Sequence, residues 1–152
     1  MQISINRYPL QPKWPLSIDT NDGPYTSIRE ARESLQQNFI FLLQTIPGEW
    51  PMNPDLGVGL AKYLFEGYRS SELDELKSRL KNQLSKYLPS VKLVNATFVH
   101  TDDDQDNLNT TLQITYSVDL LGVVDMIKFG LDTNTKTFVQ VRPEESKFGR
   151  VL

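Results

Sequence analysis

Three carboxylates, Glu49, Asp55 and Glu66, lie within or beside one loop-rich stretch of the chain. A glycoside hydrolase needs two carboxyl groups across one cleft, one of them with a raised pKa. Asp55 and Glu66 lie at the ends of a short predicted helix, where acids commonly cap the helix or face solvent. Because nothing in the spacing brings two of these groups to a sugar-sized groove, a lysozyme-like cell-wall hydrolase is the less favoured interpretation.

Most other catalytic chemistries lack the residues they need. The chain has no cysteine, which excludes thiolate metal sites and cysteine nucleophiles, and its one histidine, His100, excludes a two-histidine metal site. The acidic run 102–106 does not fit a calcium loop, because Asn107 and Gln113 stand where an EF-hand needs glycine and glutamate. We therefore expect no enzyme activity, no cofactor and no metal.

Composition and charge describe an ordinary globular chain. The 152 residues suffice for one domain with a core, and the net charge of −3 argues against a nucleic-acid partner held by phosphate neutralisation. An uninterrupted apolar run of about 18 residues, as a membrane helix requires, is missing, and residues 1–6 do not begin a secretory signal. The expectation is a soluble protein made in a cytoplasm, with no membrane partner.

Two main helices and a short one are predicted before the middle of the chain. Ser27 and Glu30 have capping-box spacing, so the first helix should begin at Thr26 or Ser27 and end at Pro47. Its apolar stripe recurs every three or four residues: Ile28, Ala31, Leu35, Phe39, Leu42, Leu43 and Ile46. A short helix should follow the loop, with Leu60, Leu64 and Phe65 on its apolar side. The third helix should begin at Ser70 or Ser71 and stop at Pro89.

Alternating segments after the third helix predict strands at 91–100, 108–120, 123–131 and 137–141. Helices followed by strands indicate an α+β fold, here two main helices plus a short helix packed on a small antiparallel β-meander sheet. We expect a single domain over residues 26–142 and a polar tail over 143–152. Residues 1–25 should form an extended arm, because four prolines prevent a helix. Its rings Tyr8, Trp14 and Tyr25 either pack on the core or dock on a neighbouring subunit.

The segment 47–66 carries the most specific pattern. Pro47-Gly48-Glu49, Pro54, residues 55–60 (DLGVGL) and Leu64-Phe65-Glu66 occur in order. This pattern resembles the baseplate-wedge family, which includes the tail-sheath initiator of contractile phage tails and a counterpart in type VI secretion baseplates. The resemblance extends over roughly residues 26–142. The chain departs from the family where a basic residue is replaced by Trp50, where phenylalanine is replaced by Leu56, and where Glu-Pro-Arg is replaced by Leu88-Pro89-Ser90.

The resemblance implies a structural assembly protein of the virion tail baseplate, assembled in the host cytoplasm and present in sixfold-symmetric copies. Its expected partners are the baseplate wedge proteins, the tail sheath protein and, through the arm, neighbouring tail-tube or hub proteins. The expected contacts with the wedge proteins are Glu49, Trp50, Pro54, Gly57, Leu60, Phe65 and Pro89. The expected contacts with the sheath are Phe138, Val139, Gln140, Val141 and Arg142.

The implied mechanism is β-augmentation, in which a sheath strand adds to an edge of the sheet. The edge is either 138–142 or the strand 123–131, and the sequence does not choose between them. A second alternative function is a regulatory module, because the fold also resembles a bacterial anti-adaptor that blocks proteolytic delivery of a sigma factor. The apparatus itself can be a phage, a secretion system or a tail-derived particle.

Overall fold

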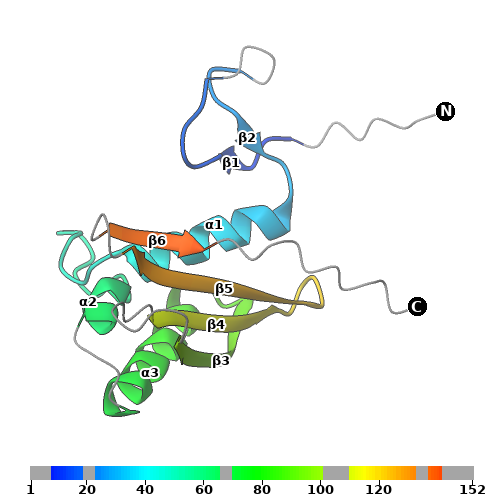
Figure 1. Ribbon diagram of the computed structural model, residues 1–152. Helices are drawn as coiled ribbons and strands as arrows, with labels where there is room; N and C mark the ends of the chain where they lie inside the picture. Colours follow the sequence, from blue (N-terminus) through cyan, green and yellow to red (C-terminus); the bar gives the residue numbers. More distant parts are fainter. Residues whose placement is uncertain (1–7, 19–22, 66–69, 101–109, 133–136, 142–152) are drawn as a thin grey trace.

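The computed structural model describes residues 8–18, 23–65, 70–100, 110–132 and 137–141 (Figure 1). The fold is α+β, as the sequence predicted. Its elements are β1 (Gln11–Pro12), β2 (Ser27–Ile28), α1 (Ala31–Gln44), α2 (Leu60–Phe65), α3 (Ser70–Tyr87), β3 (Val91–His100), β4 (Thr110–Val118), β5 (Val123–Asp132) and β6 (Thr137–Val141). No helix among the described residues is long and apolar enough to cross a membrane.

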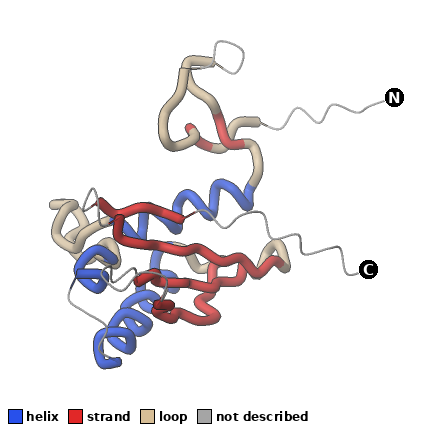
Figure 2. The backbone as a smooth tube through the Cα atoms, in the orientation of Figure 1, coloured by secondary structure: helices blue, strands red, loops and turns tan. Residues whose placement is uncertain are grey.

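The main sheet is a four-stranded antiparallel meander in the order β3-β4-β5-β6 (Figure 2). The alternation in β4 determines which face is inside, because successive side chains of a strand point to opposite faces. The alternating apolar residues of β4 are buried: Leu112, Ile114, Tyr116 and Val118. The predicted strand boundaries agree with the structure to within two residues, and those of β6 agree fully.

The helices supply the other half of the core. Phe39, Leu42 and Leu43 of α1 are buried, as are three leucines of α3: Leu76, Leu80 and Leu84. The ring of Phe39 meets that of Tyr116 edge-on, with centroids 4.8 Å apart, so α1 packs directly on the inner face of β4. Burying each of these side chains contributes about 1.5–3 kcal/mol to stability.

The predicted start of the first helix was wrong. Ser27 and Ile28 form β2 and pair with β1, and α1 begins at Ala31 with Glu30 in the N-cap position. The Leu10 N–H donates to the Ile28 carbonyl, a contact that local spacing does not reveal. Ile46 was also wrongly included in the predicted apolar stripe. It lies beyond the end of α1 and is 57% exposed.

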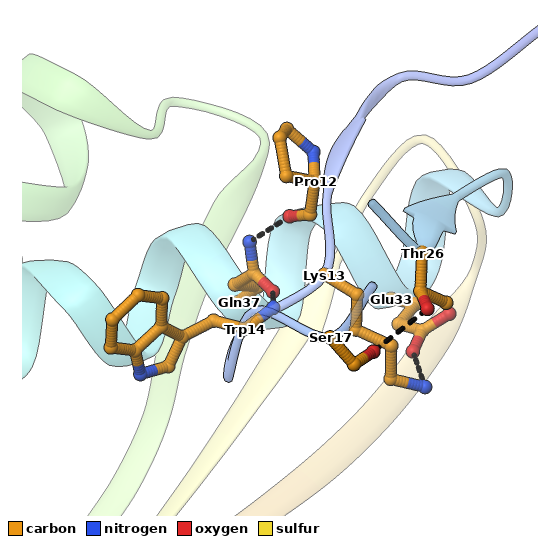
Figure 3. A network of polar contacts seen from close by, with 7 residues as sticks. All are labelled: Pro12, Lys13, Trp14, Ser17, Thr26, Glu33 and Gln37. Atoms are coloured by element: carbon orange, nitrogen blue, oxygen red, sulfur yellow. Dashed lines mark hydrogen bonds and ion pairs between the residues drawn. The ribbon is translucent and has the colours of Figure 1, made fainter. Parts of the chain in front are cut away.

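The described part of the N-terminal arm folds back onto α1. The side-chain amide of Gln37 makes two bonds to it: the amide oxygen accepts from the Trp14 N–H at 2.7 Å, and the amide nitrogen donates to the Pro12 carbonyl at 3.0 Å (Figure 3). Lys13 pairs with Glu33 at 2.8 Å. The Trp14 ring meets Phe41 edge-on at 6.1 Å but stays 60% exposed.

The predicted arm rings therefore do not join the core. Tyr8 is 87% exposed and Tyr25 is 45% exposed. In Figure 1 the arm stands at the N-terminal end of α1, away from the main sheet. Of the two accounts that the sequence left open, the structure does not support packing on the chain's own core. Docking on a neighbour remains a proposal.

An ion pair ties the start of α1 to β5. The Arg32 guanidinium donates to both carboxylate oxygens of Asp125, with 2.8 Å from Nε to Oδ2. Asp125 lies opposite Tyr116 in the register of β4 and β5. The pair contributes more than a typical surface pair, because it is bidentate and Asp125 is largely covered.

The Tyr116 hydroxyl is buried, and it has no hydrogen-bond partner among the described residues. Burial raises the pKa of Tyr116 above its usual range, and the nearby Asp125 carboxylate raises it further. The folded state thus holds the neutral phenol, whereas the unfolded chain ionises it near pH 10. Its contribution to stability is fully present below about pH 10 and is lost as the pH rises above that value.

We predict that Tyr116→Phe folds with a free energy of unfolding equal to or about 1 kcal/mol above that of the parent at pH 7, because it removes an unsatisfied hydroxyl. Between pH 9 and 11 the variant should lose less stability than the parent. Chemical denaturation at each pH measures both effects, with the exposed Tyr25→Phe as the control. A loss of more than about 1 kcal/mol at pH 7 would contradict the prediction.

Candidate partner-binding site

The loop between α1 and α2 is closed by its own backbone. The Gly48 N–H donates to the Pro54 carbonyl at 2.8 Å, which closes the outer part of the loop. The Gly59 N–H donates to the Thr45 carbonyl at 2.9 Å, and the Val58 N–H donates to the Leu42 carbonyl at 3.0 Å. The loop is therefore an ordered extension of the end of α1, and its prolines and glycines favour such a conformation.

Gly57 is the position that the loop conformation depends on. Its φ is +106°, and a Cβ atom there would lie 2.2 Å from the Thr45 carbonyl oxygen. Both of its backbone groups are held by α3: the N–H donates to Gln83 Oε1 at 2.9 Å, and the carbonyl accepts from Arg79 Nε at 3.1 Å and Nη2 at 2.8 Å. Gln83 also donates to the Asp55 carbonyl at 2.8 Å.

The two described carboxylates of this region, Glu49 and Asp55, do not converge on a cleft. Glu49 is exposed, and its Oε2 accepts the Ile46 N–H at 3.2 Å. Asp55 is exposed and is held through its main chain. Glu66 lies outside the described residues, as does the acidic run 102–106. In the part of the chain that is described, no group of acids and histidines could hold a metal ion.

An apolar groove of about 540 Å³ opens between α1, the loop and the end of α3. Its lining consists of Asn38, Phe41, Leu42, Thr45, Trp50, Leu56, Tyr87 and Leu88. None of these side chains carries a formal charge. Trp50 and Leu88, which replace a basic residue and a glutamate of the family pattern, lie on this same groove. The Tyr87 hydroxyl donates to the Asn53 side chain at 3.0 Å, which joins the groove to the loop.

The residues expected to contact the wedge proteins divide into two groups. Glu49, Trp50 and Pro54 are exposed on the loop, whereas Gly57 and Leu60 are buried inside the chain. The side chain of Phe65 lies outside the described set.

Pro89 lies instead on a second groove, of about 360 Å³, beside Lys81 and Lys92. The surface that can meet a partner is thus smaller than the sequence pattern suggested.

Sequence reasoning missed most of the residues that hold the loop and line the groove. Gln83 and Arg79 hold the loop, and Phe41 and Tyr87 line the groove. One signal was available for Gln83, because it is a polar residue beside Leu80 and Leu84 on the buried stripe of α3 and is only 7% exposed. A buried amide needs partners, and here they are the backbone groups of the loop.

The expected sheath contacts belong to the C-terminal part of the chain, around the last strand. Residues 138–141 belong to β6, which lies at one edge of the main sheet. Arg142 lies outside the described residues. The alternative strand 123–131 is not a free edge along its whole length, because β6 pairs with Lys128–Asp132 of β5.

Comparison with known proteins gives one family and a set of similar folds. The sequence profile of the family "Baseplate wedge protein gp25" matches residues 29–121. A chain of the anti-feeding prophage baseplate, solved with 6-fold symmetry, has a TM-score of 0.58 at 19% identity, covering 71% of this chain and 83% of that one. A search of curated proteins found no significant match.

A Geobacter sulfurreducens crystal structure that carries the provisional name tail lysozyme has a TM-score of 0.54 at 20% identity, covering 69% of this chain and 93% of that one. At these identities, both likenesses show the fold alone.

We predict that Gly57→Ala lowers the free energy of unfolding by about 3 kcal/mol or more, because it adds a clash with Thr45 to the cost of a positive φ. The matched control is Gly48→Ala. Gly48 has a φ of +89° and open space around a Cβ, so only the backbone cost of about 1–2 kcal/mol applies. Chemical denaturation of both variants gives the comparison, and equal losses would contradict the role assigned to the contact with Thr45.

Proposed function

The chain belongs to the baseplate wedge protein gp25 family, and we propose that it is a structural component of a contractile-tail baseplate which binds neighbouring wedge proteins and templates the first ring of tail sheath. The observation that carries the proposal is the family match over residues 29–121, which span the three helices and the first two strands of the main sheet. The likeness to a chain of a 6-fold symmetrised baseplate supports sixfold copies in the assembly. The protein acts through its surfaces, without cofactor or metal.

The apolar groove is the proposed contact with the wedge proteins. Its uncharged lining suits apolar side chains, such as those on one face of a helix in the wedge core bundle. Exposed aromatic residues on the rim, Trp50 above all, are typical of positions that carry much of an interface's binding energy. The bonds from Gln83 and Arg79 hold the loop in place before binding, so little entropy is lost when a partner docks.

We predict that Trp50→Ala weakens incorporation into baseplates by about 30-fold or more, the loss expected for an aromatic anchor of about 2 kcal/mol. Met52→Ala is the matched control, because Met52 is in the same loop, is 96% exposed and does not line the groove. Incorporation is measured by quantifying the protein in purified baseplates at increasing concentration. Normal incorporation of the Trp50 variant would argue against the groove.

The outer edge of β6 is the proposed contact with the sheath. Among the described residues, β6 pairs with β5 on one side and ends the strand order, so backbone donors and acceptors on its other side face a place for an added strand. Backbone bonds of this kind supply adhesion, and the alternating side chains supply register. The arm is the proposed contact with tail-tube or hub proteins, since its apolar residues Tyr8, Leu16 and Ile18 are exposed.

We predict that two proline variants in β6 differ in their effects on thermal stability and on sheath nucleation. Successive N–H groups of a strand point to opposite sides, so one of Val139→Pro and Gln140→Pro removes an N–H facing β5 and the other removes an N–H facing outward. The outward variant should keep nearly the parental thermal stability and lose most sheath nucleation. Melting curves and electron microscopy of sheath rings on reconstituted baseplates measure this. If neither variant reduces nucleation, the β6 edge is not the contact.

A further inference from the structure

The N-terminal arm and the apolar groove meet at Phe41. Phe41 is one of the residues that line the groove, and its ring is also the edge-on neighbour of the Trp14 ring, with centroids 6.1 Å apart. Phe41 is 39% exposed and Trp14 is 60% exposed, so both rings present apolar area to solvent. The apolar surface of the groove therefore continues through Phe41 onto the arm. We call Trp14 and Phe41 the aromatic pair.

Polar contacts fix the backbone of the arm on α1 at this point. Four successive arm residues each contact α1, in the pairs Gln11 with Ser34, Pro12 with Gln37, Lys13 with Glu33, and Trp14 with Gln37. Figure 3 shows the ring of Trp14 pointing away from the contacts that hold its backbone. The ring is thus placed beside Phe41 before a partner arrives, so little entropy is lost when a partner covers it.

The residues particular to this chain gather on the same surface. Trp14 precedes the family match, which begins at residue 29. Three lining residues of the groove also depart from the family pattern, and they are Trp50, Leu56 and Leu88. All four side chains are apolar or aromatic, and the residues that dominate an interface cluster together on it. Their placement on one continuous surface is therefore expected if they meet one partner.

We propose that Trp14 belongs to the wedge contact, so that the aromatic pair and the groove bind one wedge-protein segment together. The inference rests on the proposed function, which brings a wedge protein to the groove. The segment that fits is a helix whose apolar face covers Trp14 as well as the groove. A buried indole N–H needs an acceptor, so the segment also offers a carbonyl, amide or carboxylate oxygen opposite Trp14. Tyr8 and Ile18 of the arm keep their proposed contact with tail-tube or hub proteins.

Site-specific photocrosslinking in assembled baseplates tests the inference. The full chain carries benzoylphenylalanine in place of Trp14, Trp50 or Tyr25, and mass spectrometry identifies the captured protein. We expect positions 14 and 50 to capture the same wedge protein. Tyr25 is the control, because it is an exposed ring of the same arm that does not line the groove. Capture of a tube, hub or sheath protein at position 14, or equal capture of the wedge protein at position 25, overturns the inference.

The affinity of the chain for baseplates gives an independent test. Trp14→Ala should raise the concentration for half-maximal incorporation by about tenfold, the effect of losing one aromatic anchor. Trp14→Phe should recover part of the loss, because it keeps a ring but lacks the indole N–H. Tyr25→Ala should incorporate like the parent. The Trp14 variants should keep the parental melting temperature, since the ring is 60% exposed. Unchanged incorporation of Trp14→Ala overturns the inference.

Gln37 is the positioning residue of the aromatic pair, and a double-mutant cycle tests that role. Gln37→Leu removes both bonds to the arm but leaves Trp14 in the chain. It should weaken incorporation by about threefold to fivefold in the parent and by less than about twofold in the Trp14→Ala background, because the two residues act as a unit. Equal losses in the two backgrounds would show that Gln37 does not act through Trp14, and would overturn its role.

The outcomes separate this inference from the proposed function. If position 50 captures a wedge protein while position 14 captures a different protein or none, the inference alone is overturned and the groove contact stands. If position 50 captures no wedge protein in assembled baseplates, the proposed groove contact is wrong, and the inference fails with it.

Discussion

The hydrogen bonds from α3 to the backbone N–H and carbonyl of Gly57 are the interactions on which the rest of the structure depends. Arg79 and Gln83 satisfy the carbonyl and the N–H of a residue whose conformation only glycine adopts readily. Through Gly57, the end of α1 is fixed against α3, because the Cα of Gly57 lies close against Thr45. The loop, the start of α2 and both walls of the groove follow from that placement.

Such rigidity suits an assembly protein. A partner that docks on a preformed surface does not bear the cost of ordering a loop, so more of the contact energy appears as affinity. The polar groups of the groove are neutral, and three residues that depart from the family pattern, Trp50, Leu56 and Leu88, lie on it together. A basic residue and a glutamate of the pattern are replaced by Trp50 and Leu88, which agrees with the proposed apolar contact.

The sheet contributes a different kind of surface. Its inner face is filled by both main helices, and the ion pair of Arg32 with Asp125 links the start of α1 to β5. Its last strand is short, so the edge steps from β6 to β5 without a described strand filling the gap. An edge strand presents backbone donors and acceptors, which agrees with the proposed addition of a sheath strand at β6.

Periodic signals in the sequence determined much of the fold. The alternation of β4 and the spacing of the leucines in α3 depend on near neighbours, so the strand boundaries and the predicted helix agree with the structure. Contacts between distant segments were decided only by the tertiary structure. β1 pairs with β2 and removes Ser27 from the helix, and α3 reaches back to Gly57.

Trp50 and Leu88 likewise meet on one groove although 38 positions separate them. The physical reason is that periodicity reports which face of an element is apolar, whereas a site requires knowing which faces meet. Sequence therefore established the class of fold and the family. Only packing showed that Gly57 and Leu60 are internal, that Trp50 is on the surface, and that β6 pairs with Lys128–Asp132 of β5.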